Sequence, residues 1–168
     1  MADKALGGIS VKVLKDESRV RFKGELNYEP ADSTEKWVYQ VHSVPASPAV
    51  IFTTNDEFFG EANAPLQATD NVLWIAIKHS GTSDGTNTTA EGIMVNYEAG
   101  NAPLWNGTDG AHTNNMIVGP NELFVFRPNG TEVQDILVGT VKLTGNKASA
   151  TGTGTVEIYV SAIIDDGA

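Results

Sequence analysis

Ile9-Ser-Val-Lys-Val13 alternates apolar with polar residues, and Arg19-Val-Arg-Phe-Lys-Gly24 repeats this alternation a few residues later. A period of two is that of a strand with one buried face. Both stretches therefore predict antiparallel strands. Further short runs rich in Val, Ile, Thr and aromatic residues, which favour strands, predict others at Trp37–Val44, Ala49–Thr54, Val72–His79, Gly92–Tyr97, Asn115–Val118, Leu123–Arg127, Ile136–Leu143 and Thr155–Ile164.

Turn residues separate these runs. Asn106-Gly107 and Asp109-Gly110 favour the positive φ of tight reversals. About ten short strands without a convincing 3.6-residue period predict an all-β fold. We expect a single-domain antiparallel β-sandwich over residues 1–168, jelly-roll-like, with a β-barrel as the fallback. Asp56–Ala64 is the segment where a short helix or an irregular loop is expected.

Length and composition exclude several classes of protein. The chain has 168 residues and no Cys, which excludes a disulfide scaffold, a Cys-based zinc site and a thiol nucleophile. It holds no apolar run of about 18 residues and no apolar core of a secretory leader near Met1, so we expect neither a membrane span nor passage through a secretory pathway. A net charge of -10 disfavours nucleic acid as a partner.

The charges are unevenly distributed along the chain. Residues 1–36 are neutral, so residues 37–168 carry the whole net charge of -10. Within the neutral region a basic strip surrounds Asp16 and Glu17, and such asymmetry can dock an acidic surface. Cations on the solvent face of two strands explain the same pattern. The strip is the candidate site for such docking and consists of Lys12, Lys15, Arg19, Arg21 and Lys23.

Gly81-Thr-Ser-Asp-Gly85 matches the G-x-S-x-G motif of serine hydrolases, and Asp109 and His112 follow in the hydrolase order. The motif requires a strand, a sharp turn and then a helix that supports the oxyanion hole. A good strand precedes the motif, but Thr86–Thr89 and another strand-like run follow it. We therefore interpret Ser83 as a turn residue, and we expect no catalytic site.

The sequence gives only weak indications of a metal site or of the two carboxylates of a glycosidase. The histidines are far apart and match no zinc-binding pattern: His42, His79 and His112. Aspartates that could bind calcium lie where turns or termini prefer them: Asp84, Asp109, Asp165 and Asp166. The carboxylates Asp56, Glu57 and Glu61 cluster in sequence, which a solvated acidic loop explains. We expect no metal and no cofactor.

Two of the three tryptophans bear on function. Trp74 lies inside Val72–Ile77 and is expected in the core. Trp105, in Asn101-Ala-Pro-Leu-Trp-Asn-Gly107, is expected in a loop. An exposed loop tryptophan can bind a glycan or contact a neighbouring subunit, because its large amphipathic surface suits both. Trp105 is therefore the candidate interface or glycan-contact residue.

Four stretches resemble small structural proteins of tailed-phage virions, and capsid decoration (cement) proteins most of all. They are Asn71-Val-Leu-Trp-Ile-Ala-Ile-Lys-His-Ser-Gly-Thr82, Ile117-Val-Gly-Pro-Asn-Glu122, Thr151-Gly-Thr-Gly-Thr-Val156 and Ile163-Ile-Asp-Asp166. The resemblance implies a non-enzymatic protein that binds the outside of the shell, commonly as a trimer. Its partner would be the major capsid protein, and its place the outer surface of the virion after synthesis in the host cytoplasm. The alternative is a carbohydrate- or receptor-binding β-sandwich of a tail or fibre.

Overall fold

The computed structural model divides the chain into two compact units, Met1–Glu35 and Lys36–Ala168. The boundary lies one residue from the point where the charge composition changes. The prediction of a single domain over residues 1–168 stays a prediction. The structure describes residues 5–15, 18–28, 36–52, 66–96, 116–128, 131–144 and 147–165.

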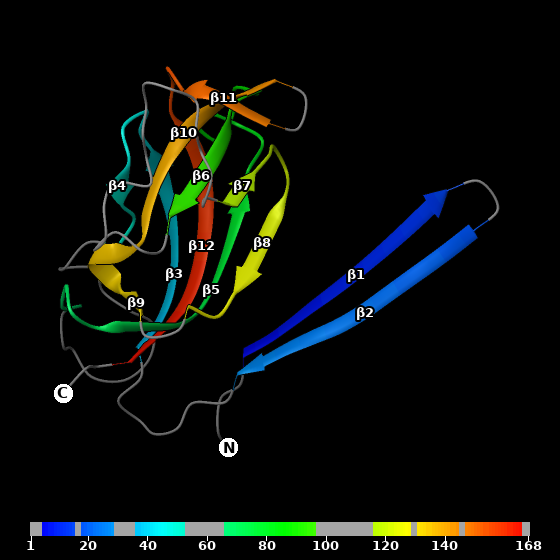
Figure 1. Ribbon diagram of the computed structural model, residues 1–168. Helices are drawn as coiled ribbons and strands as arrows, with labels where there is room; N and C mark the ends of the chain where they lie inside the picture. Colours follow the sequence, from blue (N-terminus) through cyan, green and yellow to red (C-terminus); the bar gives the residue numbers. More distant parts are fainter. Residues whose placement is uncertain are drawn as a thin grey trace. The chain divides into compact units, whose positions relative to one another are not determined.

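The first unit is a β-hairpin. Strand β1 (Ala5–Lys15) pairs antiparallel with β2 (Ser18–Tyr28), and both are drawn in blue in Figure 1. The ladder is continuous, because Ala5 lies opposite Tyr28 at one end and Lys15 opposite Ser18 at the other. The alternation that predicted these two strands is therefore matched by a regular pairing over the length of both.

The second unit contains two antiparallel sheets. The first has the strand order β3-β12-β5-β8, with the short β9 also paired to β5. Its strands are β3 (Lys36–Val44), β12 (Val156–Asp165), β5 (Asn71–His79), β8 (Leu123–Phe126) and β9 (Thr131–Glu132).

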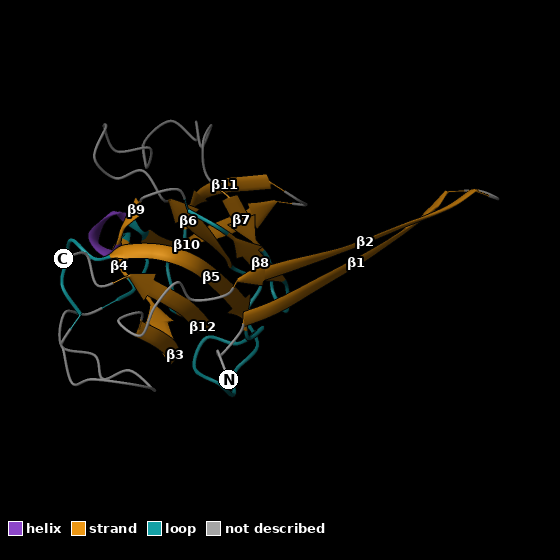
Figure 2. Cartoon of the chain, turned by 90° about the horizontal axis from the view of Figure 1, so that it is seen from below, coloured by secondary structure: helices purple, strands orange, loops and turns teal. Residues whose placement is uncertain are grey.

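The second sheet has the order β11-β10-β6-β7, with β4 also paired to β10 (Figure 1). Its strands are β11 (Lys147–Thr151), β10 (Leu137–Thr144), β6 (Gly92–Asn96), β7 (Met116–Val118) and β4 (Ala49–Val50). Among the described residues, the one helical turn is the 3-10 helix η2 (Val133–Asp135), purple in Figure 2.

The strand order is that of a jelly roll. When β9 and β11 are set aside and the other strands of the second unit are numbered along the chain, one sheet reads first, eighth, third, sixth. The other reads second, seventh, fourth, fifth. This double-sheet arrangement is the jelly-roll architecture, in which successive strands alternate between the two sheets except at the central hairpin. The predicted all-β, jelly-roll-like sandwich is confirmed.

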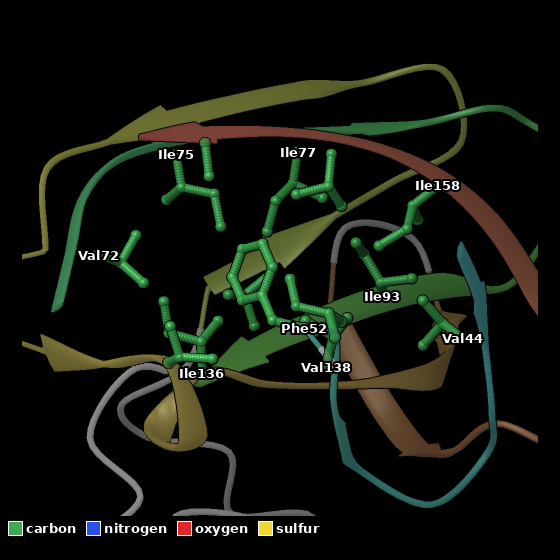
Figure 3. Close-up of a cluster of buried hydrophobic side chains, with 14 of the residues drawn as sticks. Val44, Phe52, Val72, Ile75, Ile77, Ile93, Ile136, Val138 and Ile158 are labelled. Atoms are coloured by element: carbon green, nitrogen blue, oxygen red, sulfur yellow. The ribbon is translucent and has the colours of Figure 1, made fainter. Parts of the chain in front are cut away.

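The core lies between the two sheets. In Figure 3, Phe52 stands between Ile75 and Ile77 of β5 on one side and Ile136 and Val138 on the other. Strand β4 ends at Val50, earlier than the predicted strand Ala49–Thr54, and Ile51 and Phe52 after it are buried; residues 53–54 lie outside the described residues. Each fully buried apolar side chain contributes about 1.5–3 kcal/mol through the hydrophobic effect.

The other predicted strands of the second unit agree with the structure to within a residue or two, whereas β1 and β2 extend up to four residues beyond the predicted alternation. Two strands were missed. Strands β9 and β11 were not predicted, and β11 begins just after the predicted turn at Gly145-Asn146. Trp74 is buried as expected, with 7% of its surface exposed, but its pairing with Ile163 places it on the outward parity of β5, outside the core cluster between the sheets. The segment Asp56–Ala64 lies outside the described residues.

Candidate docking surfaces

The register of the hairpin separates apolar from basic residues. Val11 lies opposite Phe22, whereas Lys12 lies opposite Arg21. Consecutive residues of a strand belong to opposite faces, so within residues 9–24 the ladder has two distinct faces. The apolar face includes Ile9, Val11, Val13, Val20 and Phe22; the other, which we call the basic face, includes Lys12, Leu14, Arg19, Arg21 and Lys23.

Four of the five residues of the predicted basic strip share this face. Lys15 does not, because it lies opposite Ser18 on the apolar face. Lys12 and Arg21 are directly opposite each other, and like charges in that position destabilise a strand pair. The basic face is therefore suited to an acidic surface.

A second surface is the outer face of the β3-β12-β5-β8 sheet. Strand pairing places eight residues there in two rows, and we call them the outer array. In the order β3, β12, β5, β8, the first row is Val41, Tyr159, Lys78 and Leu123. The second row, one step further along the strands, is Tyr39, Ser161, Ala76 and Val125.

The outer array is apolar and hollowed. Tyr39 is 58% exposed, Val41 52% and Leu123 58%. A hollow of about 440 Å³ lies among them, lined by Val160 and by every member of the outer array except Val41 and Val125. Exposed apolar patches are common at protein–protein contacts, and tyrosine is enriched there.

Tyr159 lines this hollow and is hydrogen-bonded to a carboxylate on its own strand. Its hydroxyl donates a hydrogen bond to Oε1 of Glu157 across 3.3 Å. The negative charge of Glu157 raises the pKa of Tyr159, and desolvation and this hydrogen bond raise it further. The phenol is therefore neutral at physiological pH, and its hydroxyl is directed toward Glu157 at the rim.

The G-x-S-x-G motif forms a tight loop after β5. The backbone N–H of Ser83 donates to the carbonyl of Asn87 across 2.8 Å, and that of Thr89 donates to the carbonyl of Gly81 across 3.1 Å. Gly81 and Gly85 have positive φ values of 87° and 80°. Residues 86–91 are not helical. The strand-turn-helix geometry of a nucleophile elbow is therefore not found here, and Asp109 and His112 lie outside the described residues.

Two of the residues considered for metal binding, His79 and Asp84, bind backbone groups of the loop after β5. Both ring nitrogens of His79 bind backbone groups: Nε2 binds the carbonyl of Glu91, and Nδ1 accepts from the N–H of Gly81. Asp84 Oδ1 accepts from the backbone N–H groups of Thr86 and Asn87. The part of the chain that the structure describes holds no group of three or more His, Cys, Asp or Glu placed to bind a metal ion. The other predicted candidates outside this part are Asp56, Glu57, Glu61, Trp105 and Asp166.

Comparisons with protein-family models, with curated proteins and with solved structures find no match to this chain. Within the described ranges, no helix has the length and apolar character needed to cross a bilayer. Function is therefore inferred from the basic face and the outer array.

The outer array was missed by sequence reasoning, although one signal was present. The outward positions of Val156–Ile164 include two apolar residues, Tyr159 and Ile163, beside Glu157 and Ser161, and apolar residues on both faces are typical of a strand whose two faces are both covered. A strand facing solvent on one side alternates more strictly, as β1 and β2 do. Tyr159 and Ile163, both on the outward parity of β12, were the residues that carried this signal.

Proposed function

We propose that this chain is a non-enzymatic structural protein of a tailed-phage virion. It binds the outer surface of the assembled shell as a decoration protein and stabilises the shell there. The observation that carries the proposal is the register of the hairpin, which gathers Lys12, Arg19, Arg21 and Lys23 on one face. The resemblance of the chain to decoration proteins gives the class of partner.

Electrostatics orients this docking. Residues 37–168 carry the net charge of -10 and are repelled by an acidic lattice of capsid subunits, whereas the basic face is attracted to it. Exposed ion pairs contribute only about 0–1 kcal/mol each, so charge steers the encounter and apolar contacts supply most of the affinity. The apolar face of the hairpin and the outer array are the two apolar surfaces identified for such contacts.

The matched pair Lys12→Glu and Lys15→Glu tests the proposal. Both substitutions make the same change of charge in β1, three residues apart, but Lys12 lies on the basic face and Lys15 on the apolar face. Association with empty capsids of the virus that encodes the chain is measured by co-sedimentation and stopped-flow mixing. We expect Lys12→Glu to slow association several times more than Lys15→Glu, with the difference shrinking as salt screens the charges.

Two results contradict the proposal. The first is that the wild-type chain does not bind the capsids at any salt concentration. The second is that the two variants associate at the same rate in low salt while both remain folded, because the basic face then has no part in docking. Combining Lys12→Glu with Arg19→Glu and Arg21→Glu extends the test to most of the basic face.

The glycan-binding alternative depends on Trp105, which lies outside the described residues. A glycan array with the wild-type chain and Trp105→Ala separates the two functions. A signal that Trp105→Ala abolishes favours the tail or fibre module over the decoration protein. No signal, together with binding to capsids, favours the decoration protein.

A further inference from the structure

We propose that the outer array is a contact between two copies of this chain, related by a twofold axis. The sheet faces of the two copies pack against each other, and the first row of each outer array covers the second row of the other. This contact concerns the chain in solution and does not depend on the capsid role proposed above.

The order of large and small residues in the outer array is what points to a second copy. On the two central strands the first row holds Tyr159 and Lys78, and the second row holds Ser161 and Ala76. Each large residue thus has a small neighbour two positions away on its own strand. Both pairs line the hollow, together with Tyr39, Leu123 and Val160.

A twofold axis between the two facing sheets, running across the strands and between the rows, exchanges the rows. Tyr159 of one copy then lies over Ser161 of the second copy, and Lys78 lies over Ala76 of the second copy. The twofold makes each contact occur twice, since the same patch serves both copies. The large residues of each copy therefore fill the hollow of the other.

The flanking strands complete the contact. The same axis places Val41 against Tyr39 on β3 and Leu123 against Val125 on β8, so the exposed apolar residues at both edges gain apolar neighbours. Facing sheets pack about 10 Å apart with side chains of both layers between them. Burying this apolar surface supplies the driving force.

Charge also favours this face over others for two acidic copies. The outer array contains one charged residue, Lys78, and no carboxylate. Two copies that each carry a net charge of -10 repel each other in most relative orientations. Contact through the outer array brings no carboxylates together, and the long stem of Lys78 can lie against apolar surface with its ammonium group in water.

Sedimentation velocity on the full chain tests the proposal, over a concentration range of about 1 to 500 μM, where contacts of modest size associate. We expect a monomer–dimer equilibrium. Ser161→Tyr puts a large residue against Tyr159 of the second copy and should weaken dimerisation about tenfold or more. Combining it with Tyr159→Ser restores the pairing of large with small and should recover much of the loss.

Thr144→Tyr is the control for adding a tyrosine. Thr144 is exposed on β10, in the opposite sheet, so this variant should dimerise like the wild type. Leu123→Glu is a second interface variant, since Leu123 is 58% exposed and its substitution spares the core; it should also weaken dimerisation. Circular dichroism and the urea midpoint establish that each variant is folded.

Three outcomes overturn the proposal: a wild-type chain that stays monomeric throughout the range, a trimer, and dimers unaffected by both Ser161→Tyr and Leu123→Glu. A trimer, which is the state that the resemblance to decoration proteins implies, counts against it because a face that packs on itself through a twofold axis closes at two copies. Binding to capsids is measured separately, so the two proposals can fail independently.

Discussion

The imidazole of His79 connects the two ends of the loop between β5 and β6. Its Nδ1 accepts a hydrogen bond from the backbone N–H of Gly81 across 2.9 Å, so Nε2 carries the proton and donates to the carbonyl of Glu91, also across 2.9 Å. The side chain is fully buried. Burial lowers the pKa of His79, although the carbonyl of Glu91 and the charge of Glu122 act in the opposite direction.

This arrangement predicts a loss of stability in mild acid. Because the pKa is lower in the folded state than its ordinary value of 6.5, the unfolded chain binds a proton first as the pH falls. The contribution of His79 is fully present above pH 6.5 and is lost as the pH falls from there through the folded pKa. Urea unfolding between pH 8 and pH 5 should show a midpoint that declines only in the acidic half.

Replacing His79 tests this assignment. His79→Gln should flatten the decline of the urea midpoint, at the expense of lower stability at pH 7, because an amide cannot reproduce both backbone hydrogen bonds in the same positions. His112→Gln is the control for removing a histidine and should keep the decline. An unchanged decline in His79→Gln assigns the acid sensitivity to other groups.

Glu91 holds the turn between β11 and β12 from 62 residues away. Its Oε1 accepts from the N–H and hydroxyl of Thr153, at 2.9 and 3.1 Å, and its Oε2 accepts from the N–H of Gly154 at 3.2 Å. Burial raises the pKa of Glu91, but these donors and the hydroxyl of Thr140 outweigh it, and the net shift is downward. Its contribution is therefore present above pH 4.5 and is lost as the pH falls through the folded pKa.

Glu91→Gln should destabilise the protein by about 1 kcal/mol at pH 7, since an amide replaces one acceptor oxygen with a donor and the site is partly exposed. The difference from wild type should shrink below pH 4.5, because the carboxylate of the unfolded wild type takes up a proton there and that of the folded wild type follows at its lower pKa. Urea unfolding at pH 7 and pH 3 measures both differences. Equal stability of the two proteins at pH 7 would contradict the assigned role.

The same turn gives a matched pair of glycine variants. A Cβ at Gly152 meets Oγ1 of Thr140 and lies 2.6 Å from Oε2 of Glu91, whereas a Cβ at Gly154 has its nearest neighbour at 3.7 Å. Gly152→Ala should therefore cost about 1–3 kcal/mol through overpacking. Gly154→Ala should stay within about 0.5 kcal/mol of wild type. Thermal unfolding compares the two, and similar losses at both positions would contradict the crowding at Gly152.

The strands of this fold could be predicted because alternation is a local property. Val72–His79 and Thr155–Ile164 were predicted within a residue of β5 and β12. Strand β9 was not predicted, because its two residues, Thr131 and Glu132, are too few to show a period and form a strand only by pairing with β5. Strand β11 includes Ala-Ser-Ala, which has little β propensity, and it is held by its partner β10.

The candidate surfaces were only partly predictable, because both depend on pairing. The cations near the hairpin turn are evident in the sequence. Only the strand register shows that Lys12 shares a face of the hairpin with Arg21, whereas Lys15 belongs to the opposite face. The outer array brings Lys78 beside Tyr159, 81 positions further along the chain. Sequence spacing gives no sign of such a neighbour until the strand order is known.

We predict that Ser83 of the G-x-S-x-G motif is not a nucleophile. Its hydroxyl donates to the carbonyl of Asn87 across 3.3 Å, in the loop that Asp84 closes through the N–H groups of Thr86 and Asn87. A serine nucleophile needs a base within hydrogen-bond reach, and both nitrogens of the nearby His79 are occupied by backbone groups. A fluorophosphonate probe should label the wild type no more than Ser83→Ala. Labelling that Ser83→Ala abolishes would make this loop a reactive site and overturn the interpretation of the motif as a turn.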